Sequence, residues 1–152
     1  METRKKEALK IVGLSVETLN APGRAENEIP GLWMKFMEAN LIEKVTNRIS
    51  DDVYAVYCKY EGDHLAPYTT LIGYAIPTDE ATPSGLTEIA IPESNYSVFK
   101  AEGDLTDKAV LNTWNTIWNT DLNRNYIADF EIYGDEASNP KDGKIDIFVG
   151  IK

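Results

Sequence analysis

The sequence predicts an α+β fold in which a strand-helix-strand-strand unit occurs twice within one domain, residues 1–152. Two segments carry apolar residues at helical spacing, and the segments around them alternate polar and apolar residues as half-buried strands do. Turn-forming residues near 78–93 divide the chain into halves of about 8–78 and 86–152. Each half would form an antiparallel sheet that needs a helix on one face. We therefore expect one curved antiparallel sheet, two main helices and a central groove where the halves meet.

The first half begins with a polar segment, residues 1–7, which we expect to be a frayed arm, followed by a strand over 9–19. A helix over residues 26–45 comes next, because apolar side chains recur at i, i+3, i+4, i+7 and i+8. Asn27 is the expected cap, and Pro30 falls in the first turn, where a missing N–H does no harm. The face expected to be buried consists of Ile29, Leu32, Trp33, Phe36 and Met37.

Residues 53–61 and 68–76 are predicted to form a hairpin, since both are rich in Tyr, Val, Ile and Thr. Gly73 lies inside the second of these strands. A glycine in a strand interior often marks a bulge or the close approach of another group.

In the second half, strands are predicted at 86–91, 96–102, 129–133 and 144–151. A helix over 107–120, with Thr106 as its cap, follows from the same helical spacing of apolar residues. Its buried face is expected to consist of Val110, Leu111, Trp114, Ile117 and Trp118. The intervening residues 122–126 and 134–143 are predicted to be loops.

Composition narrows the classes of function. Hydrophobic residues make up 43% of the chain and charged residues 26%, as in a folded domain. The formal net charge of −10 argues against direct binding of nucleic acid.

Cys58 and His64 are the only residues of their types, so neither a zinc cluster nor a Ser-His-Asp or Cys-His catalyst is expected. His64 is assigned to a surface turn. With no transmembrane run and no signal-peptide core, we expect a cytoplasmic protein without metal or cofactor.

The strand 129–133 holds the most informative residue, Glu131. Alternate side chains of a strand point to opposite faces, so Asp129, Glu131 and Tyr133 share one face. This parity does not say which face is covered. A solvated strand glutamate is the common case, and Asp129 is expected to be solvated. An enclosed Glu131 would need hydrogen-bond donors, a proton or a cation.

Five stretches, taken together, resemble the GyrI-like effector-binding domains found in AraC-type and multidrug-responsive regulators. They are residues 29–36 (IPGLWMKF), 71–74 (LIGY), 96–103 (YSVFKAEG), 114–118 (WNTIW) and 129–133 (DFEIY). In order and spacing they extend over almost the whole chain from Leu9, and the standalone integron-cassette effector-binding proteins are the most similar group. The resemblance implies a duplicated β-α-β-β fold, in agreement with the order of elements predicted above.

The resemblance also implies reversible binding of a small, lipophilic and often cationic molecule in an aromatic groove. The glutamate of the family corresponds to Glu131, and its first-helix tryptophan corresponds to Trp33. Aromatic faces attract organic cations, and the helix stripes and strands of this chain supply several. The expected ligand-binding residues are Glu131, Trp33, Tyr74, Tyr96, Phe36, Met37, Trp114 and Trp118. Tryptophans at helical spacing are otherwise more often plain core residues.

Two other functions stay open. Some GyrI-like proteins hydrolyse strained cyclopropane-type natural products, and Glu131 would then be the catalytic acid or base. The chain would alternatively be a protein-interaction module. With about ten residues before the first strand, we expect no helix-turn-helix, so control of transcription would need a regulator protein as partner; a homodimer is the other assembly considered.

Overall fold

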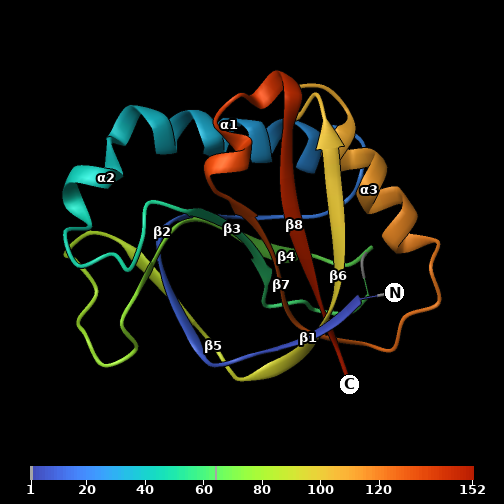
Figure 1. Ribbon diagram of the computed structural model, residues 1–152, viewed down its shortest axis with the longest axis horizontal. Coiled ribbons are helices and arrows are strands. Elements are labelled where there is room, and N and C mark those ends of the chain that lie inside the picture. The colour runs from blue at the N-terminus through green and yellow to red at the C-terminus, as the bar shows by residue number, and fades with distance from the viewer. Residues whose placement is uncertain (1, 64) are drawn as a thin grey trace.

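The protein is described by a computed structural model that covers residues 2–63 and 65–152, so the prediction for His64 lies outside the described residues. Within them the fold is α+β. It consists of one strongly curved, eight-stranded antiparallel sheet and three α-helices, which lie on one side of the sheet (Figure 1). The helices are α1 (Ala25–Ala39), α2 (Leu41–Lys44) and α3 (Ala109–Trp118). The strands are β1 (Glu2–Lys6), β2 (Leu9–Thr18), β3 (Val53–Cys58), β4 (Tyr68–Ile76), β5 (Thr87–Ile91), β6 (Ser94–Gly103), β7 (Arg124–Tyr133) and β8 (Gly143–Ile151).

The predicted duplication is confirmed by the order of the elements. One unit is β2-α1-β3-β4 and the other is β6-α3-β7-β8. The strands follow one another in the sheet as β1-β6-β8-β7-β3-β4-β2-β5, so the units meet where β3 pairs with β7. The edge strands β1 and β5 extend the sheet at its two ends.

Both long helices cover the same face of the sheet. Helix α1 packs Leu32 and Phe36 against β2, β3 and β4, while α3 packs Trp114 and Ile117 against β6 and β8. The opposite face lies inside the curl and has its own core, in which the rings of Phe130 and Phe148 stack with centroids 5.0 Å apart. The strands are therefore buried on both sides at the centre of the sheet.

The N-terminal arm is not frayed over residues 2–6, which corrects the prediction for that part of residues 1–7. Residues 2–6 form β1, which pairs with β6 from Glu2↔Val98 to Lys6↔Ser94. The side chains of Arg4 and Lys6 lie over the ring of Phe148, with Lys6 Nζ 4.7 Å from the ring centroid. Attraction between these cations and the ring adds to the backbone pairing.

The first predicted helix is correct in place but wrong in detail. It begins at Ala25, one residue earlier than expected, so Asn27 lies within its first turn and is not its cap, and Pro30 lies inside the helix. It ends at Ala39 rather than at residue 45, and Asn40, whose φ is 50°, separates α1 from α2. Asparagine tolerates this left-handed conformation better than most residues. The side chain of Met37 is 73% exposed, so it does not belong to the buried face.

Two predictions in the second half are also wrong. Thr106 does not cap α3, which begins at Ala109 and is flanked by Lys108. Residues 122–126 are not a loop throughout, because β7 already begins at Arg124. The strand is irregular there: its pairing with β8 shifts register between Arg124 and Asp129, and Tyr126 has a φ of 54°. This irregular stretch brings Arg124, at the start of β7, within ion-pair distance of Asp129 in the middle of the strand.

The close approach predicted at Gly73 is confirmed. Gly13 of β2 and Gly73 of β4 are paired directly. A Cβ at Gly73 would lie 1.9 Å from the carbonyl oxygen of Val12, and one at Gly13 would lie 2.0 Å from that of Ile72. Two backbones this close leave no space for side chains, which lets the sheet coil tightly over its inner core.

We therefore predict that Gly73→Ala lowers the free energy of unfolding by more than about 2 kcal/mol, because backbone must move to make space. Gly31→Ala is the matched control: a Cβ at Gly31 meets no atom within 4 Å in the middle of α1. That change should stabilise by about 0.5–1 kcal/mol, since alanine favours helix. Urea denaturation measures both, and equal effects of the two substitutions would contradict the prediction.

Candidate functional site

Glu131 lies at the centre of the sheet and its side chain is only 1% exposed. It belongs to β7, between Ala55 of β3 and Ile147 of β8, on the face that α1 and α3 cover. The reading of Glu131 as a solvated strand residue is therefore wrong. Phe130 and Ile132 point to the other core, as strand parity predicts.

Three neutral donors from three elements bind the Glu131 carboxylate. The hydroxyl of Tyr57 on β3 and the indole N–H of Trp114 on α3 donate to Oε2, over 2.9 Å and 2.7 Å. The hydroxyl of Tyr133, on the same face of β7, donates to Oε1 over 2.7 Å. In the described part of the chain, no ion pair includes Glu131. The carboxylate is thus hydrogen-bonded but has no cation.

Burial raises the pKa of Glu131, and the hydrogen bonds from Trp114, Tyr133 and Tyr57 oppose that rise. Burial, together with the nearby carboxylate, also holds the pKa values of Tyr57 and Tyr133 well above that of an ordinary tyrosine. Both hydroxyls therefore keep their protons and remain donors. The result is an enclosed negative charge surrounded by neutral groups.

Aromatic rings line this carboxylate on both sides. The ring of Trp33 on α1 meets that of Tyr133 edge-on, with centroids 5.0 Å apart. Tyr57 meets Trp114 edge-on at 5.4 Å, and Trp114 lies 6.1 Å from Trp118 on the next turn of α3. Both helices thus contribute tryptophan to one cluster around Glu131.

A second carboxylate, Asp129, is fully buried two residues away on the same face, so its predicted exposure to solvent is wrong. Arg124 pairs with it over 2.6 Å, and the hydroxyl of Tyr60 and the backbone N–H of Gly150 donate to it. The guanidinium of Arg124 also lies over the rings of Tyr60 and Tyr126, at 5.7 Å and 4.4 Å. Burial raises the pKa of Asp129, and the positive charge of Arg124 opposes that rise.

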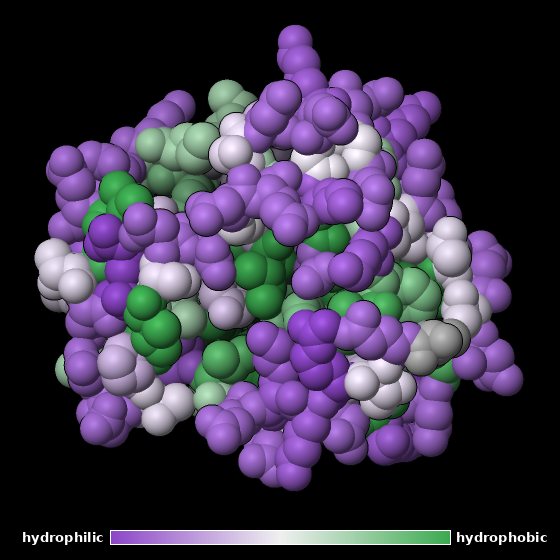
Figure 2. Space-filling view, in the orientation of Figure 1, coloured by the Kyte–Doolittle hydropathy of each residue, from purple (hydrophilic) through white to green (hydrophobic). Residues whose placement is uncertain are grey.

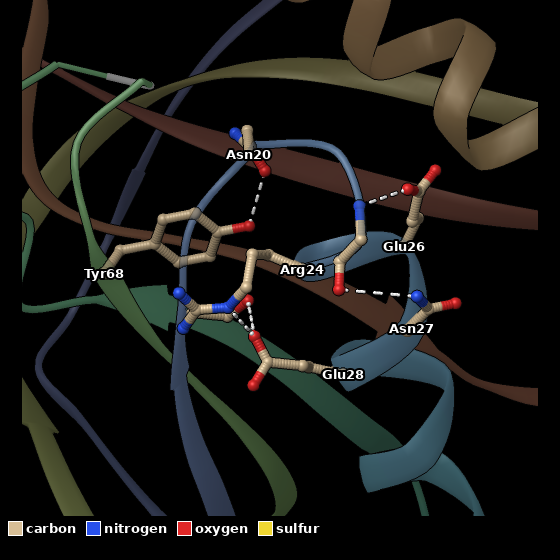
Figure 3. Close-up of polar contacts among 8 residues, drawn as sticks. Asn20, Arg24, Glu26, Asn27, Glu28 and Tyr68 are labelled. Carbon is tan, nitrogen blue, oxygen red and sulfur yellow. Dashed lines mark hydrogen bonds and ion pairs between the residues drawn. The ribbon is translucent and has the colours of Figure 1, made fainter.

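The start of α1 is attached to the edge of the aromatic cluster, as Figure 3 shows for several of the residues involved. The hydroxyl of Tyr68 on β4 donates to Asn20 over 2.6 Å, and Arg24 pairs with Glu28 over 2.6 Å. The hydroxyl of Thr18, at the end of β2, also donates to Glu28. Burial, with the charges of Glu131 and Glu28, raises the pKa of Tyr68 to about 12. The Tyr68 hydroxyl therefore keeps its proton and remains a donor to Asn20.

The structure brings together only part of the predicted site. Trp33, Trp114 and Trp118 lie in the cluster around Glu131, whereas Phe36 and Tyr74 pack on each other in the core below α1. Tyr96 is on the opposite face of the sheet, against Phe130 and Phe148. Met37 faces solvent. These last two side chains do not reach Glu131 in this structure.

Sequence reasoning missed Tyr57, Tyr68 and Arg124 as neighbours of the two carboxylates. Tyr133 could have been included from strand parity alone, because it shares the face of Glu131. Tyr57 could not, since its role depends on the pairing of β3 with β7, two strands far apart in the sequence.

The carboxylate is closed off from solvent. Two surface hollows, of about 590 Å³ and 490 Å³, lie elsewhere and do not include Glu131. The first is lined by Glu102, Gly103, Glu136, Asp142, Gly143 and Lys144, and the second lies beside α3 and β6. On the face shown in Figure 2, hydrophilic residues predominate and hydrophobic residues appear in several small areas. A ligand would reach Glu131 only after the covering aromatic side chains move.

Two other kinds of site receive no support from the described residues. No group of three or more His, Cys, Asp or Glu side chains among them is placed to hold a metal ion. None of the helices in this part of the chain is both long and apolar enough to cross a membrane.

A family model and a curated relative each match almost the whole chain. The family model described as Cass2, integron-associated effector binding protein, matches residues 3–151. YobU of Bacillus subtilis (strain 168), provisionally named a transcriptional regulator, is 31% identical over 147 residues, which cover 94% of this chain and 92% of YobU.

Solved structures share the fold. The integron cassette protein VCH_CASS2 from the mobile metagenome of Vibrio cholerae matches with a TM-score of 0.73 and 21% identity, over 99% of this chain and 95% of its own. SAV2435, solved with tetraphenylphosphonium bound, matches with a TM-score of 0.80 and 18% identity, over 99% of this chain and 93% of its own.

The raised pKa of Glu131 predicts a pH-dependent difference between the wild type and Glu131→Gln. In the window above the pKa of an unfolded glutamate, about 4.3, the folded wild type still holds a proton that the unfolded chain has lost. This stabilisation is fully present below the window and is lost as pH rises through the folded pKa. The free energy of unfolding of Glu131→Gln, measured by urea denaturation, should therefore increase relative to wild type as pH rises. An unchanged difference between Glu131→Gln and wild type across this pH range would contradict the prediction.

Removal of Arg124 should destabilise the fold strongly, because Asp129 would be left buried without its cation. We expect Arg124→Met to lower the free energy of unfolding by about 3 kcal/mol or more. Arg24→Met removes an arginine from an exposed pair with Glu28 and should have a small effect. Similar losses in the two variants would show that Asp129 does not depend on Arg124.

Proposed function

The chain belongs to the integron-associated effector-binding protein family, and we propose that it reversibly binds a lipophilic organic cation at Glu131, between α1 and α3. The observation that carries this proposal is a fully buried carboxylate with three neutral donors and no cationic partner among the described residues. A ligand that brings a positive charge would complete this arrangement.

The physical argument is one of differential solvation. A cation whose charge is spread over, or covered by, apolar groups is weakly hydrated, so it leaves water at small cost. Glu131 has already lost its water on folding, and a cation restores the favourable interaction that burial removes. The rings of Trp33, Tyr57 and Trp114 add apolar contact, at about 25 cal/mol per Å² buried, and attraction to the cation.

Comparison with the neighbouring carboxylate, Asp129, supports the proposal that Glu131 binds a cation. Asp129 is also buried and also bound by a tyrosine hydroxyl, but it has a cation from the chain itself. That cation, Arg124, is held over two tyrosine rings. The protein thus already pairs one buried carboxylate with a planar, delocalised cation among aromatic rings, and Glu131 has the rings without the cation.

The likeness to SAV2435 adds support for the class of ligand. That protein shares the fold and is bound to tetraphenylphosphonium, a cation whose charge is covered by aryl rings. A cation of this kind suits an aromatic cluster that must open to admit it. Whether a regulator protein or a second copy of the chain responds to the bound state, and whether the chain is cytoplasmic, stay predictions.

A second candidate function, hydrolysis of a strained lipophilic compound, is favoured by one observation. Burial raises the pKa of Glu131 toward the range in which a carboxyl group can serve as general acid or base near neutral pH. The three donors oppose that rise, and they hold the carboxylate by both oxygens. Binding without chemistry therefore accounts better for the geometry.

The proposal predicts a charge-selective titration of tryptophan fluorescence. Tetraphenylphosphonium should bind, and Glu131→Gln should weaken it by at least about tenfold, because the buried charge pair is lost. Neutral triphenylphosphine oxide should bind with the same affinity to both proteins. Trp33→Ala should weaken both compounds, since it removes ring area rather than charge.

Glu38→Gln is the control for net charge, because it removes one negative charge at an exposed site of α1. It should leave both affinities unchanged. Equal binding of the cation by wild type and Glu131→Gln would contradict the proposal. Mass spectrometry after incubation with cyclopropane-bearing natural products separates the second candidate, since turnover that disappears in Glu131→Gln would establish hydrolysis.

A further inference from the structure

One buried hydroxyl near the Glu131 cluster has no hydrogen-bond partner in the described structure. Thr70, in the middle of β4, has 0% of its surface exposed, and its Oγ1 atom is buried without a partner. A buried hydroxyl that forms no hydrogen bond costs free energy, and most such groups in proteins are paired. Neighbouring Thr18, equally buried, shows the usual solution, because its hydroxyl donates to Glu28.

Thr70 lies on the same face of the sheet as Glu131. It is paired with Tyr57 on one side and with Val16 on the other, and it shares a face of β4 with Tyr68 and Ile72. That face is the one covered by the helices, since Ile72 packs in the core below α1. Tyr57, the direct neighbour of Thr70, is also the residue whose hydroxyl binds Glu131.

The positions of Thr70 and Glu131 in the sheet suit one ligand of moderate size. Glu131 is on β7 and Thr70 is on β4, with β3 between them. Their strands are two spacings, roughly 10 Å, apart across the sheet. Thr70 is in register with Tyr57 and Asp129, and Glu131 lies two residues further along β7, so the two residues are separated by roughly 12 Å. The β3 side chains nearest to these two residues on this face are the ring of Tyr57, beside Thr70, and the small Ala55, beside Glu131. A molecule that enters between this face and the helices, once the covering side chains have moved, can meet the carboxylate at one end and the hydroxyl at the other.

We propose that Thr70 is a specificity-determining residue, and that the ligand carries a hydrogen-bonding group, such as a hydroxyl, an amide or an N–H, in addition to its cationic centre. This inference rests on the proposed function of Glu131 and narrows its class of ligand. A purely aryl or alkyl cation satisfies the carboxylate but leaves Thr70 Oγ1 unpaired. A cation with a polar substituent satisfies both, because a threonine hydroxyl can donate and accept.

Two isosteric pairs test this inference together. The probes are (4-hydroxymethylphenyl)triphenylphosphonium and (4-ethylphenyl)triphenylphosphonium, which differ by a hydroxyl in place of a methyl group. The proteins are wild type and Thr70→Val, which differ in the same way. The preference for the hydroxymethyl probe is the ratio of the Kd of the ethyl probe to that of the hydroxymethyl probe. This ratio should be roughly three- to tenfold higher in wild type than in Thr70→Val, because one hydrogen bond contributes about that much to affinity. An equal preference in the two proteins overturns the inference.

Stability of the protein without ligand gives a second, independent measurement. Thr70→Val removes a hydroxyl that has no partner, so the melting temperature should stay the same or rise. A fall of several degrees would show that the hydroxyl is already satisfied inside the protein, for example by a buried water, and would overturn the inference. Thr69→Val, on the other face of β4, is the control and should leave the probe preference unchanged.

Glu131→Gln distinguishes this inference from the proposal on which it rests. If Glu131→Gln weakens both phosphonium probes while Thr70→Val leaves their ratio unchanged, only the role of Thr70 is refuted. If neither probe binds to wild type, or if Glu131→Gln weakens neither, cation binding at Glu131 is refuted and the role of Thr70 is refuted with it.

Discussion

The removal of the Glu131 carboxylate from water is the constraint on which the rest of the structure depends. Such a group must be met by hydrogen-bond donors, and here they come from β3, β7 and α3. These contacts tie a strand of the first half to a strand and a helix of the second. Apolar packing on either side would tolerate small shifts of α3, whereas the hydrogen bond from Trp114 fixes where the helix lies.

Much of this arrangement could be predicted from local sequence. The alternation around Glu131 identifies the side chains on its face, the helical spacing of Trp33 and Trp114 places them toward the sheet, and Gly73 indicates a close approach of backbones. These signals extend over only a few residues, so they survive without knowledge of the fold.

The rest depends on contacts between distant segments. Tyr57 reaches Glu131 only because β3 and β7 pair in a particular register. Asp129 is buried only because an irregular stretch of β7 returns Arg124 to it. The break of the first helix depends on the left-handed backbone of Asn40, which leaves the apolar pattern around it unchanged. None of these three features has a signature within a single strand or helix.

Closure of the site also has a consequence for kinetics. Glu131 is only 1% exposed and its carboxylate is bound by Tyr57, Trp114 and Tyr133, so a ligand could enter only molecules in which covering side chains have moved aside. The apparent affinity is then the intrinsic affinity multiplied by the fraction of open molecules. The observed association rate would level off at high ligand concentration, where the movement of the covering side chains becomes the slowest step. Such a protein exchanges its ligand on a timescale set by its own fold rather than by diffusion.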